Sequence, residues 1–242
     1  MTCQDGLWIP FRRTSPDSRV RLLCFAFAGG GASTFRSWSL PQVDICPIQL
    51  PGRENRFKEV PITNMDLLAE TLVAQLPLPD DLPIAFFGHS LGAFIAYEMM
   101  KRLGGTALFV SACPAPHIAR NGSPMHTLPG PEFLAAVKAM DGIPPVIREN
   151  SDLLSFFAPV LRADLKLYET YRPSKPAKLR GRVIAFGGES DALVTSRQLE
   201  HWGDICLDFQ MRFFPGGHFF LRDSESQVLA LIHHEIMGKR SR

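Results

Sequence analysis

The chain of 242 residues has few cysteines, little net charge and no long apolar stretch. Its cysteines, at positions 3, 24, 46, 113 and 206, are odd in number and lack metal-type spacing, so we expect reduced packing residues. A formal net charge of +2 gives no nucleic-acid signature. No run of about 18 apolar residues occurs, and the first residues lack a secretion signal. We therefore expect a cytoplasmic protein with no nucleic-acid or membrane partner and no metal or other cofactor.

What is present is the composition of a globular protein, 45% hydrophobic and 21% charged, at a length that fits one large domain. Apolar, β-rich runs predict strands at 19–27, 43–50, 82–87, 106–112, 182–187 and 208–214. Helical spacing predicts helices at 67–76, 93–100 and 226–236, and Thr63-Asn-Met-Asp66 has the form of a capping box before the first of them. This alternation predicts an α/β fold with a mostly parallel, doubly wound sheet covered on both faces.

The alternation stops between about residues 114 and 173, where helical pieces at 132–140, 152–157 and 160–171 are separated by prolines. In a doubly wound sheet an insertion at this point lies over the carboxyl ends of the strands, where ligands bind. We expect a single domain over residues 1–242, with a helical lid at about 114–173.

The most informative motif is Gly88-His-Ser-Leu-Gly92, set between an apolar strand and an amphipathic helix. A sharp strand-to-helix turn needs residues without bulk on both sides of the serine, and the two glycines meet that need. G-x-S-x-G in this setting is the nucleophile elbow of α/β-hydrolases, which makes Ser90 the candidate nucleophile. The Leu91 amide lies at a helix N-terminus, where unpaired N–H groups and the helix dipole favour an oxyanion.

A second backbone donor is expected in the loop Ala28-Gly-Gly-Gly-Ala-Ser33, directly after the first strand. The loop lacks the G-x-G-x-x-G spacing and the G-K-[ST] ending of nucleotide-binding loops, so phosphate binding is not expected. In hydrolases with an elbow, the loop after an early strand supplies the second oxyanion amide, and Ala28 is the candidate.

A serine nucleophile needs a general base. Of the seven histidines, His218 lies in a Gly-Gly-His loop directly after the last predicted strand. His89 flanks the serine, and His233 and His234 fall within a predicted helix. Position therefore favours His218.

The base in turn needs an orienting acid, and Asp191 follows the strand at 182–187 by four residues. Glu189 is a close rival, and Asp164 would lie on the lid. The order of serine, acid and histidine along the chain is the order that α/β-hydrolases use.

Five segments together resemble the type II thioesterases of polyketide and nonribosomal peptide assembly lines. They are Phe25-Ala-Phe-Ala-Gly-Gly30, Leu50-Pro-Gly-Arg-Glu-Asn-Arg56, Gly88-His-Ser-Leu-Gly-Ala93, Leu161-Arg-Ala-Asp-Leu-Lys-Leu-Tyr-Glu-Thr-Tyr171 and Gly216-Gly-His-Phe-Phe220. The resemblance runs from about residue 20 to residue 236 and implies an α/β-hydrolase that removes stalled or wrong acyl groups from the phosphopantetheine arm of acyl or peptidyl carrier proteins.

The resemblance also assigns roles. Ser90, Asp191 and His218 match the family's catalytic triad, and Ala28 and Leu91 its oxyanion positions. Ala26 departs from the proline often found in that loop, although a backbone donor does not depend on it. We expect a monomer that acts by hydrolysis on carrier proteins.

Some assignments stay open at this point. Phe133, Met140, Phe156, Phe157, Leu161 and Leu165 either line an acyl chamber or form the lid's own core, and the substrate-binding residues are unknown. Lys101, Arg102, Arg120 and Arg148 either meet an acidic carrier protein or are solvated surface charges. The alternative functions are a general carboxylesterase, a medium-chain fatty acyl thioesterase and a catalytically silent binding protein.

Overall fold

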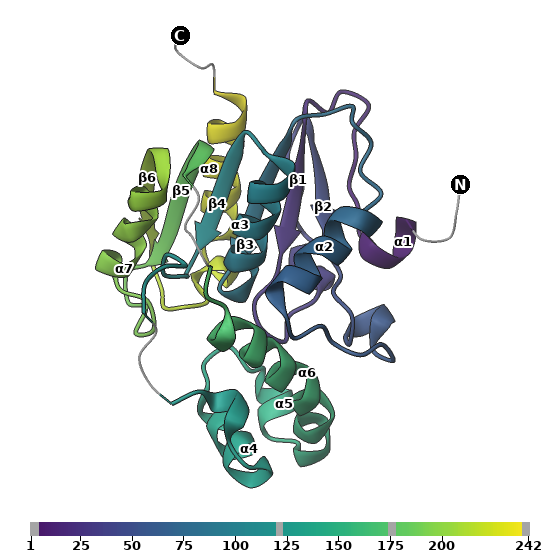
Figure 1. The fold of residues 1–242 in the computed structure, drawn as a ribbon, viewed down its shortest axis with the longest axis vertical. Coiled ribbons are helices and arrows are strands. Elements are labelled where there is room, and N and C mark those ends of the chain that lie inside the picture. The colour runs from purple at the N-terminus through teal and green to yellow at the C-terminus, as the bar shows by residue number, and fades with distance from the viewer. Residues whose placement is uncertain (1–4, 120–122, 174–177, 239–242) are drawn as a thin grey trace.

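The computed structural model describes residues 5–119, 123–173 and 178–238. Six parallel strands form one sheet in the order β2-β1-β3-β4-β5-β6 (Figure 1). The strands are β1 (Val20–Phe25), β2 (Val43–Pro47), β3 (Ile84–His89), β4 (Ala107–Ser111), β5 (Leu179–Gly188) and β6 (Cys206–Phe214). All six predicted strands are confirmed, with ends that move by up to three residues, and the sheet is wholly parallel.

The helices are α1 (Asp5–Trp8), α2 (Met65–Gln75), α3 (Leu91–Leu103), α4 (Gly130–Ala139), α5 (Pro145–Arg148), α6 (Ser151–Thr170), α7 (Ser196–Glu200) and α8 (Glu225–Met237). Short 3-10 turns add η1 (Ala32–Phe35), η2 (Glu54–Arg56), η3 (Met125–Thr127), η4 (His201–Ile205) and η5 (Phe220–Arg222). Among the residues that the structure describes, no helix has the length and apolar character needed to cross a bilayer.

Helices cover both faces of the sheet, as a doubly wound fold requires. Alternate side chains of β1 point to opposite faces, so that Leu23 joins the core under α2 and α3 while Leu22 joins the core under α8. Figure 1 shows α2 and α3 in front of the sheet and α8 behind it. Strands β3 and β4 are buried on both faces and therefore read in the sequence as continuous apolar runs, whereas most residues of the edge strand β6 are not buried.

Helix α3 is the most deeply buried helix of the fold, since every residue from Leu91 to Met100 is buried. It ends at Gly104, whose φ of +69° lies in the region that glycine adopts without strain. The basic residues Lys101 and Arg102 in its last turn both bind the buried carboxylate of Glu98. These two cations are therefore engaged within the fold, and Arg120 lies outside the described residues.

Two details of the sequence prediction are wrong. Helix α2 is capped by Asn64, whose side chain accepts from the Leu67 amide, rather than by Thr63 in a capping box with Asp66. The pieces expected at 152–157 and 160–171 form one helix, α6, which continues through Pro159. Both Pro159 and Ser155, whose carbonyl loses its helical donor there, lie on the exposed side, where water can take the donor's place.

The segment between β4 and β5, called the insertion below, extends beyond the carboxyl ends of the strands (Figure 1). It has its own apolar core, which contains Phe133, Leu161 and Leu165, with Met140 packed against it. Phe156 and Phe157 instead are 61% and 37% exposed. The described cysteines, at 24, 46, 113 and 206, are free and buried, and Cys3 lies outside the described residues.

Candidate active site

Ser90 lies at the sharp turn between β3 and α3. Its φ of 54° and ψ of −119° are strained for a residue with a side chain, and such strain costs about 1–3 kcal/mol unless the surrounding structure enforces it. Its N–H donates to the Ser111 carbonyl of β4 at 2.8 Å, which continues the sheet pairing past the end of β3. The side chain is partly exposed, and Leu91 begins the helix.

The two glycines of the motif allow the strand and the helix to meet. A Cβ at Gly88 would lie 2.1 Å from the Gly92 carbonyl oxygen, and a Cβ at Gly92 would lie 2.1 Å from the Phe25 carbonyl oxygen. Carbon atoms normally pack about 3.5 Å or more from their neighbours, so neither position tolerates a side chain. The close approach brings α3 against the end of β1.

His218 and Asp191 meet at the carboxyl ends of β5 and β6. His218 Nδ1 lies 2.9 Å from Asp191 Oδ2, and their side chains are 8% and 0% exposed. The other carboxylate oxygen of Asp191 accepts from the amides of Leu193 and Val194 at 2.8 and 3.1 Å. Burial alone would raise the pKa of Asp191, but the hydrogen bond and charge of His218 and these two amides hold that pKa below its usual value. Asp191 therefore stays ionised and orients the imidazole.

His89 links this pair to the elbow, because its ring lies 5.4 Å from the His218 ring, centroid to centroid. Its Nδ1 is 2.9 Å from Ser111 Oγ. Complete burial, together with the charge of His218, lowers the pKa of His89 to about 3. A histidine that stays neutral at working pH cannot take up the proton of a nucleophile, so His89 does not fit the role of a general base.

The rival acids lie elsewhere. Glu189 is exposed. Asp164 is buried on α6, where it accepts from Arg53 and from the Gly29 amide instead of from a histidine. The structure thus brings Asp191, and neither rival, to His218.

The loop from Ala28 to Ser33 follows β1 and is held by polar side chains from the β2–α2 connection. Gln49 Oε1 accepts from the Ala32 amide at 2.7 Å, and Glu54 Oε1 accepts from Ser33 Oγ at 2.5 Å. Arg53 Nη1 donates to the Gly30 carbonyl at 3.1 Å. Taken by itself, the sequence of the turn that carries Arg53 and Glu54 is typical of solvated surface, and only the resemblance singles it out. Its charges in fact fix the loop beside the elbow.

Two cavities adjoin these residues. A polar cavity of about 230 Å³ opens over His218 and is lined by Asp141, Gly142, Gly217, Phe219, Phe220, Arg222 and Asp223. An apolar cavity of about 210 Å³ lies behind His89 and is lined mostly by Phe27, Phe35, Trp38, Phe219 and Leu221. The Phe27 and Phe219 rings, whose centroids are 5.0 Å apart, line the second cavity from the loop side and the histidine side.

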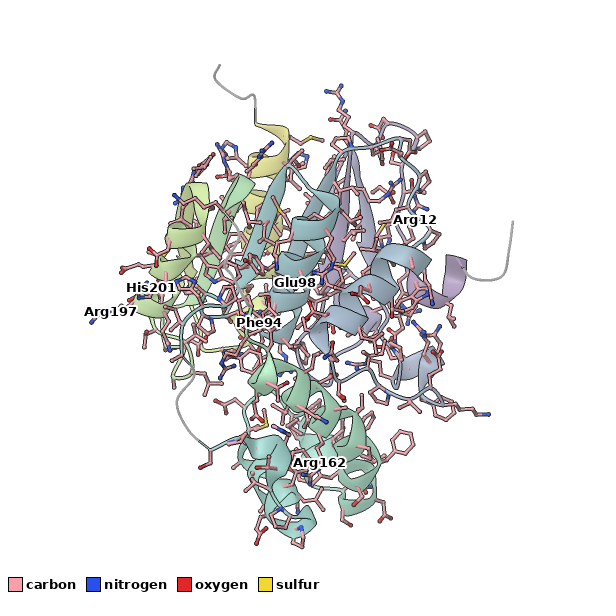
Figure 2. All side chains as sticks on the ribbon, in the orientation of Figure 1. Arg12, Phe94, Glu98, Arg162, Arg197 and His201 are labelled. Atoms are coloured by element: carbon pink, nitrogen blue, oxygen red, sulfur yellow. The ribbon has the colours of Figure 1, made fainter. Side chains whose placement is uncertain are left out.

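A group of side chains that could bind a metal lies apart from these residues. His117, His201 and Asp204 offer ligand atoms within 4.8 Å of one another. Figure 2 shows His201 at the left edge of the molecule, by α7. The Asp204 carboxylate already bridges both imidazoles, at 3.2 Å from His117 Nε2 and 2.8 Å from His201 Nδ1. Hydrogen bonding therefore accounts for this cluster.

A serine on a strained elbow, a neutral buried histidine behind it and an aspartate–histidine pair on the later strands of a parallel sheet define an α/β-hydrolase. The predicted fold class is confirmed. The Thioesterase domain family model matches residues 20–236, so the chain belongs to that family. It is a thioesterase, an enzyme that hydrolyses acyl thioesters.

Individual relatives support this family assignment. The chain is 34% identical over 236 residues to the gramicidin S biosynthesis protein GrsT of Aneurinibacillus migulanus, covering 93% of this chain and 92% of GrsT. The solved type II thioesterase BorB from the borrelidin biosynthetic cluster superposes with a TM-score of 0.84 at 31% identity, covering 97% of this chain and 99% of BorB. The medium-chain fatty acid synthase thioesterase of Rattus norvegicus is 30% identical over 228 residues, covering 88% and 86%. The resemblance to type II thioesterases is confirmed and is favoured over the fatty-acid alternative.

Proposed function

We propose that this thioesterase edits an assembly line, removing stalled or wrong acyl groups from the phosphopantetheine arms of acyl or peptidyl carrier proteins. The observation that carries the proposal is the pairing of Asp191 with His218 next to a serine elbow, in a chain similar over nearly its whole length to type II thioesterases. In this proposal Ser90, Asp191 and His218 are catalytic, and the Ala28 and Leu91 amides form the oxyanion hole.

The first half of the reaction acylates the enzyme. His218 takes the proton of Ser90 Oγ as that oxygen attacks the thioester carbonyl, while the ionised Asp191 holds the imidazole and stabilises its charge. The negative charge moves to the carbonyl oxygen, where the Leu91 N–H at the start of α3 and the Ala28 N–H stabilise it. When the carbonyl re-forms, the C–S bond breaks.

The second half releases the product. A thiol has a pKa of about 8.5, so the departing sulfur needs less help from protonated His218 than an amine would. His218 gives its proton to the departing sulfur, which leaves as the thiol, and the imidazole is neutral again. Water then loses a proton to His218 as it attacks the acyl-enzyme, and His218 returns that proton to Ser90 Oγ as the free acid leaves.

We also propose one domain with a lid. Residues 1–242 form one domain whose insertion, about 114–173, acts as a lid over the carboxyl ends of the strands. The polar cavity over His218 receives the thioester from solvent. In its wall, Arg222 Nη2 donates to the Gly142 carbonyl at 2.7 Å, which joins the segment that follows His218 to the lid. The enzyme works as a cytoplasmic monomer.

The test is the release of a short acyl group from a phosphopantetheinylated carrier protein, followed by the mass of the acyl-carrier over time. Wild type should clear the acyl group, and Ser90→Ala should not. A matched control is Ser196→Ala, an exposed serine at the start of α7, which should behave as wild type.

A series of acyl lengths and an oxygen ester separate the alternatives. Preference for medium-chain acyl groups would favour a fatty acyl thioesterase. Cleavage of the oxygen ester with an intact acyl-carrier would contradict the carrier-protein proposal while leaving the hydrolase chemistry in place. No cleavage of any substrate would contradict the catalytic roles.

A further inference from the structure

A buried ion pair joins the insertion to the β2–α2 connection. Arg53 Nη1 and Nη2 donate to the two carboxylate oxygens of Asp164 on α6, at 2.6 and 2.8 Å. The side chains are 5% and 1% exposed. A bidentate pair of this kind fixes one relative orientation of its partners, here separated by 111 residues in the sequence.

The same two side chains also hold the backbone that follows Ala28. The Gly29 N–H donates to Asp164 Oδ2 at 2.7 Å, while Arg53 binds the Gly30 carbonyl. The Gly29 N–H belongs to the rigid peptide plane next to the Ala28 Cα, so its hydrogen bond restricts rotation of the backbone at Ala28. The ion pair thus helps to determine where the Ala28 amide points.

Helix α6 is fixed to the elbow helix as well. Tyr171, at its C-terminal end, donates its hydroxyl to the buried Glu98 of α3. One turn earlier, the Tyr168 ring stacks on Phe94 with centroids 5.2 Å apart. Figure 2 shows Phe94 and Glu98 on α3. Helix α6 therefore connects the helix that begins after Ser90 with the loop that carries Ala28.

We infer that Asp164 and Arg53 are positioning residues that align the Ala28 amide with Ser90, and that docking of α6 completes the oxyanion hole. The inference rests on the proposed function, because that function gives the Ala28 amide an oxyanion to bind. The oxyanion exists only in the transition state, so loss of the alignment lowers kcat while KM changes little.

The first test uses Asp164→Asn, which keeps the size of the side chain and removes its charge. With a soluble short-chain acyl thioester, we expect kcat to fall about 10- to 100-fold, as a misplaced oxyanion donor would cause, and KM to stay within about threefold. An acyl trifluoromethyl ketone forms a hemiketal with the serine and places an oxyanion in the hole. Its inhibition constant should rise by the same factor as kcat falls.

A double variant separates positioning from folding. Arg53→Met with Asp164→Leu replaces the pair with apolar side chains of similar size, a change that often leaves stability unaltered or improved. We expect kcat as low as in Asp164→Asn, and thermal unfolding measures how much stability is lost with the bonds to the Gly29 amide and the Gly30 carbonyl. The matched control is Asp208→Asn, which removes the charge from an Arg182 partner at the amino-terminal end of β6 and should leave kcat unchanged.

The outcomes are distinguishable. If kcat recovers together with stability in the double variant, the pair acts on folding alone and the inference is wrong. Unchanged inhibition by the ketone in Asp164→Asn would also overturn it. A wild type that cleaves the soluble thioester but not the acyl-carrier contradicts only the proposed partner, whereas a wild type that cleaves neither contradicts both.

Discussion

Replacing Gly92 by alanine tests the close approach that places the elbow. The added Cβ would lie 2.1 Å from the Phe25 carbonyl oxygen and 2.6 Å from the Ala26 carbonyl oxygen. Both oxygen atoms belong to the backbone of a buried segment, so rotation of a side chain cannot relieve the clash. To move from 2.1 Å to an ordinary contact of about 3.5 Å, α3 and the end of β1 must separate by roughly 1.4 Å.

This separation has two costs. Over-packing a well-filled core typically costs about 1–3 kcal/mol, and because the obstacle is backbone we expect a loss of about 3 kcal/mol in the free energy of unfolding. The displaced segment leads directly into Ala28, so the amide that we propose for the oxyanion hole moves relative to Ser90. A misplacement of about 1 Å costs on the order of 10²-fold in rate, and we expect that loss in kcat/KM.

Urea unfolding and thioester hydrolysis, measured on the same preparations, check both values. The control is Gly130→Ala at the first residue of α4, where nothing lies within 4 Å of an added Cβ. That variant should keep full activity and be neutral or up to about 1 kcal/mol more stable. If Gly92→Ala matched wild type in stability and kcat/KM, the close approach would not be a constraint on the sequence.

Three further variants test separate parts of the structure. Asp191→Asn keeps a partner for His218 but favours the wrong tautomer, so kcat should fall by about 10⁴, as it does in chymotrypsin-type triads, and a fall below tenfold would point to another acid. Burial alone would raise the pKa of Asp44, but the hydrogen bonds and charges of two arginines, Arg12 and Arg21, hold that pKa below its usual value. The stability that the ionised carboxylate contributes is therefore present above the unfolded pKa near 3.9 and is lost as pH falls through the folded pKa. In urea, Asp44→Asn should therefore show a deficit of about 3–5 kcal/mol at pH 7 that narrows below pH 4, and a pH-independent deficit would count against this account. Tyr171→Phe removes a donor from buried Glu98 and should cost about 1.5–3 kcal/mol by thermal unfolding, whereas unchanged stability would show that the bond contributes nothing net.

The strands and the elbow could be predicted because their signals are local. A parallel strand buried on both faces is a continuous apolar run, and a serine between two glycines after such a run indicates a nucleophile turn. The match of Asp191 with His218 followed from their places after two predicted strands. Each of these inferences used only a few neighbouring residues.

The contacts of Arg53 and Asp164 could not be predicted in this way. Each is a single charged residue in a segment that reads locally as a solvated turn or an amphipathic helix, and only the folded chain brings them together. Pro159 led to the wrong prediction of two separate helices, because a proline by itself favours the end of a helix. In the structure, packing of Leu154 and Leu161 on either side of it keeps α6 continuous. Long-range packing decides both cases.

The strand order has a consequence for how the enzyme refolds. The proposed machinery is divided among the ends of β1, β3, β5 and β6, and neighbouring strands in a parallel sheet are joined by long crossovers, as in the pairing of Arg21 with Ile84. Closing such loops is slow compared with forming helices. During refolding, thioester cleavage should therefore return after the helical circular dichroism signal has recovered. The return of cleavage then marks the pairing of the last strand with the sheet.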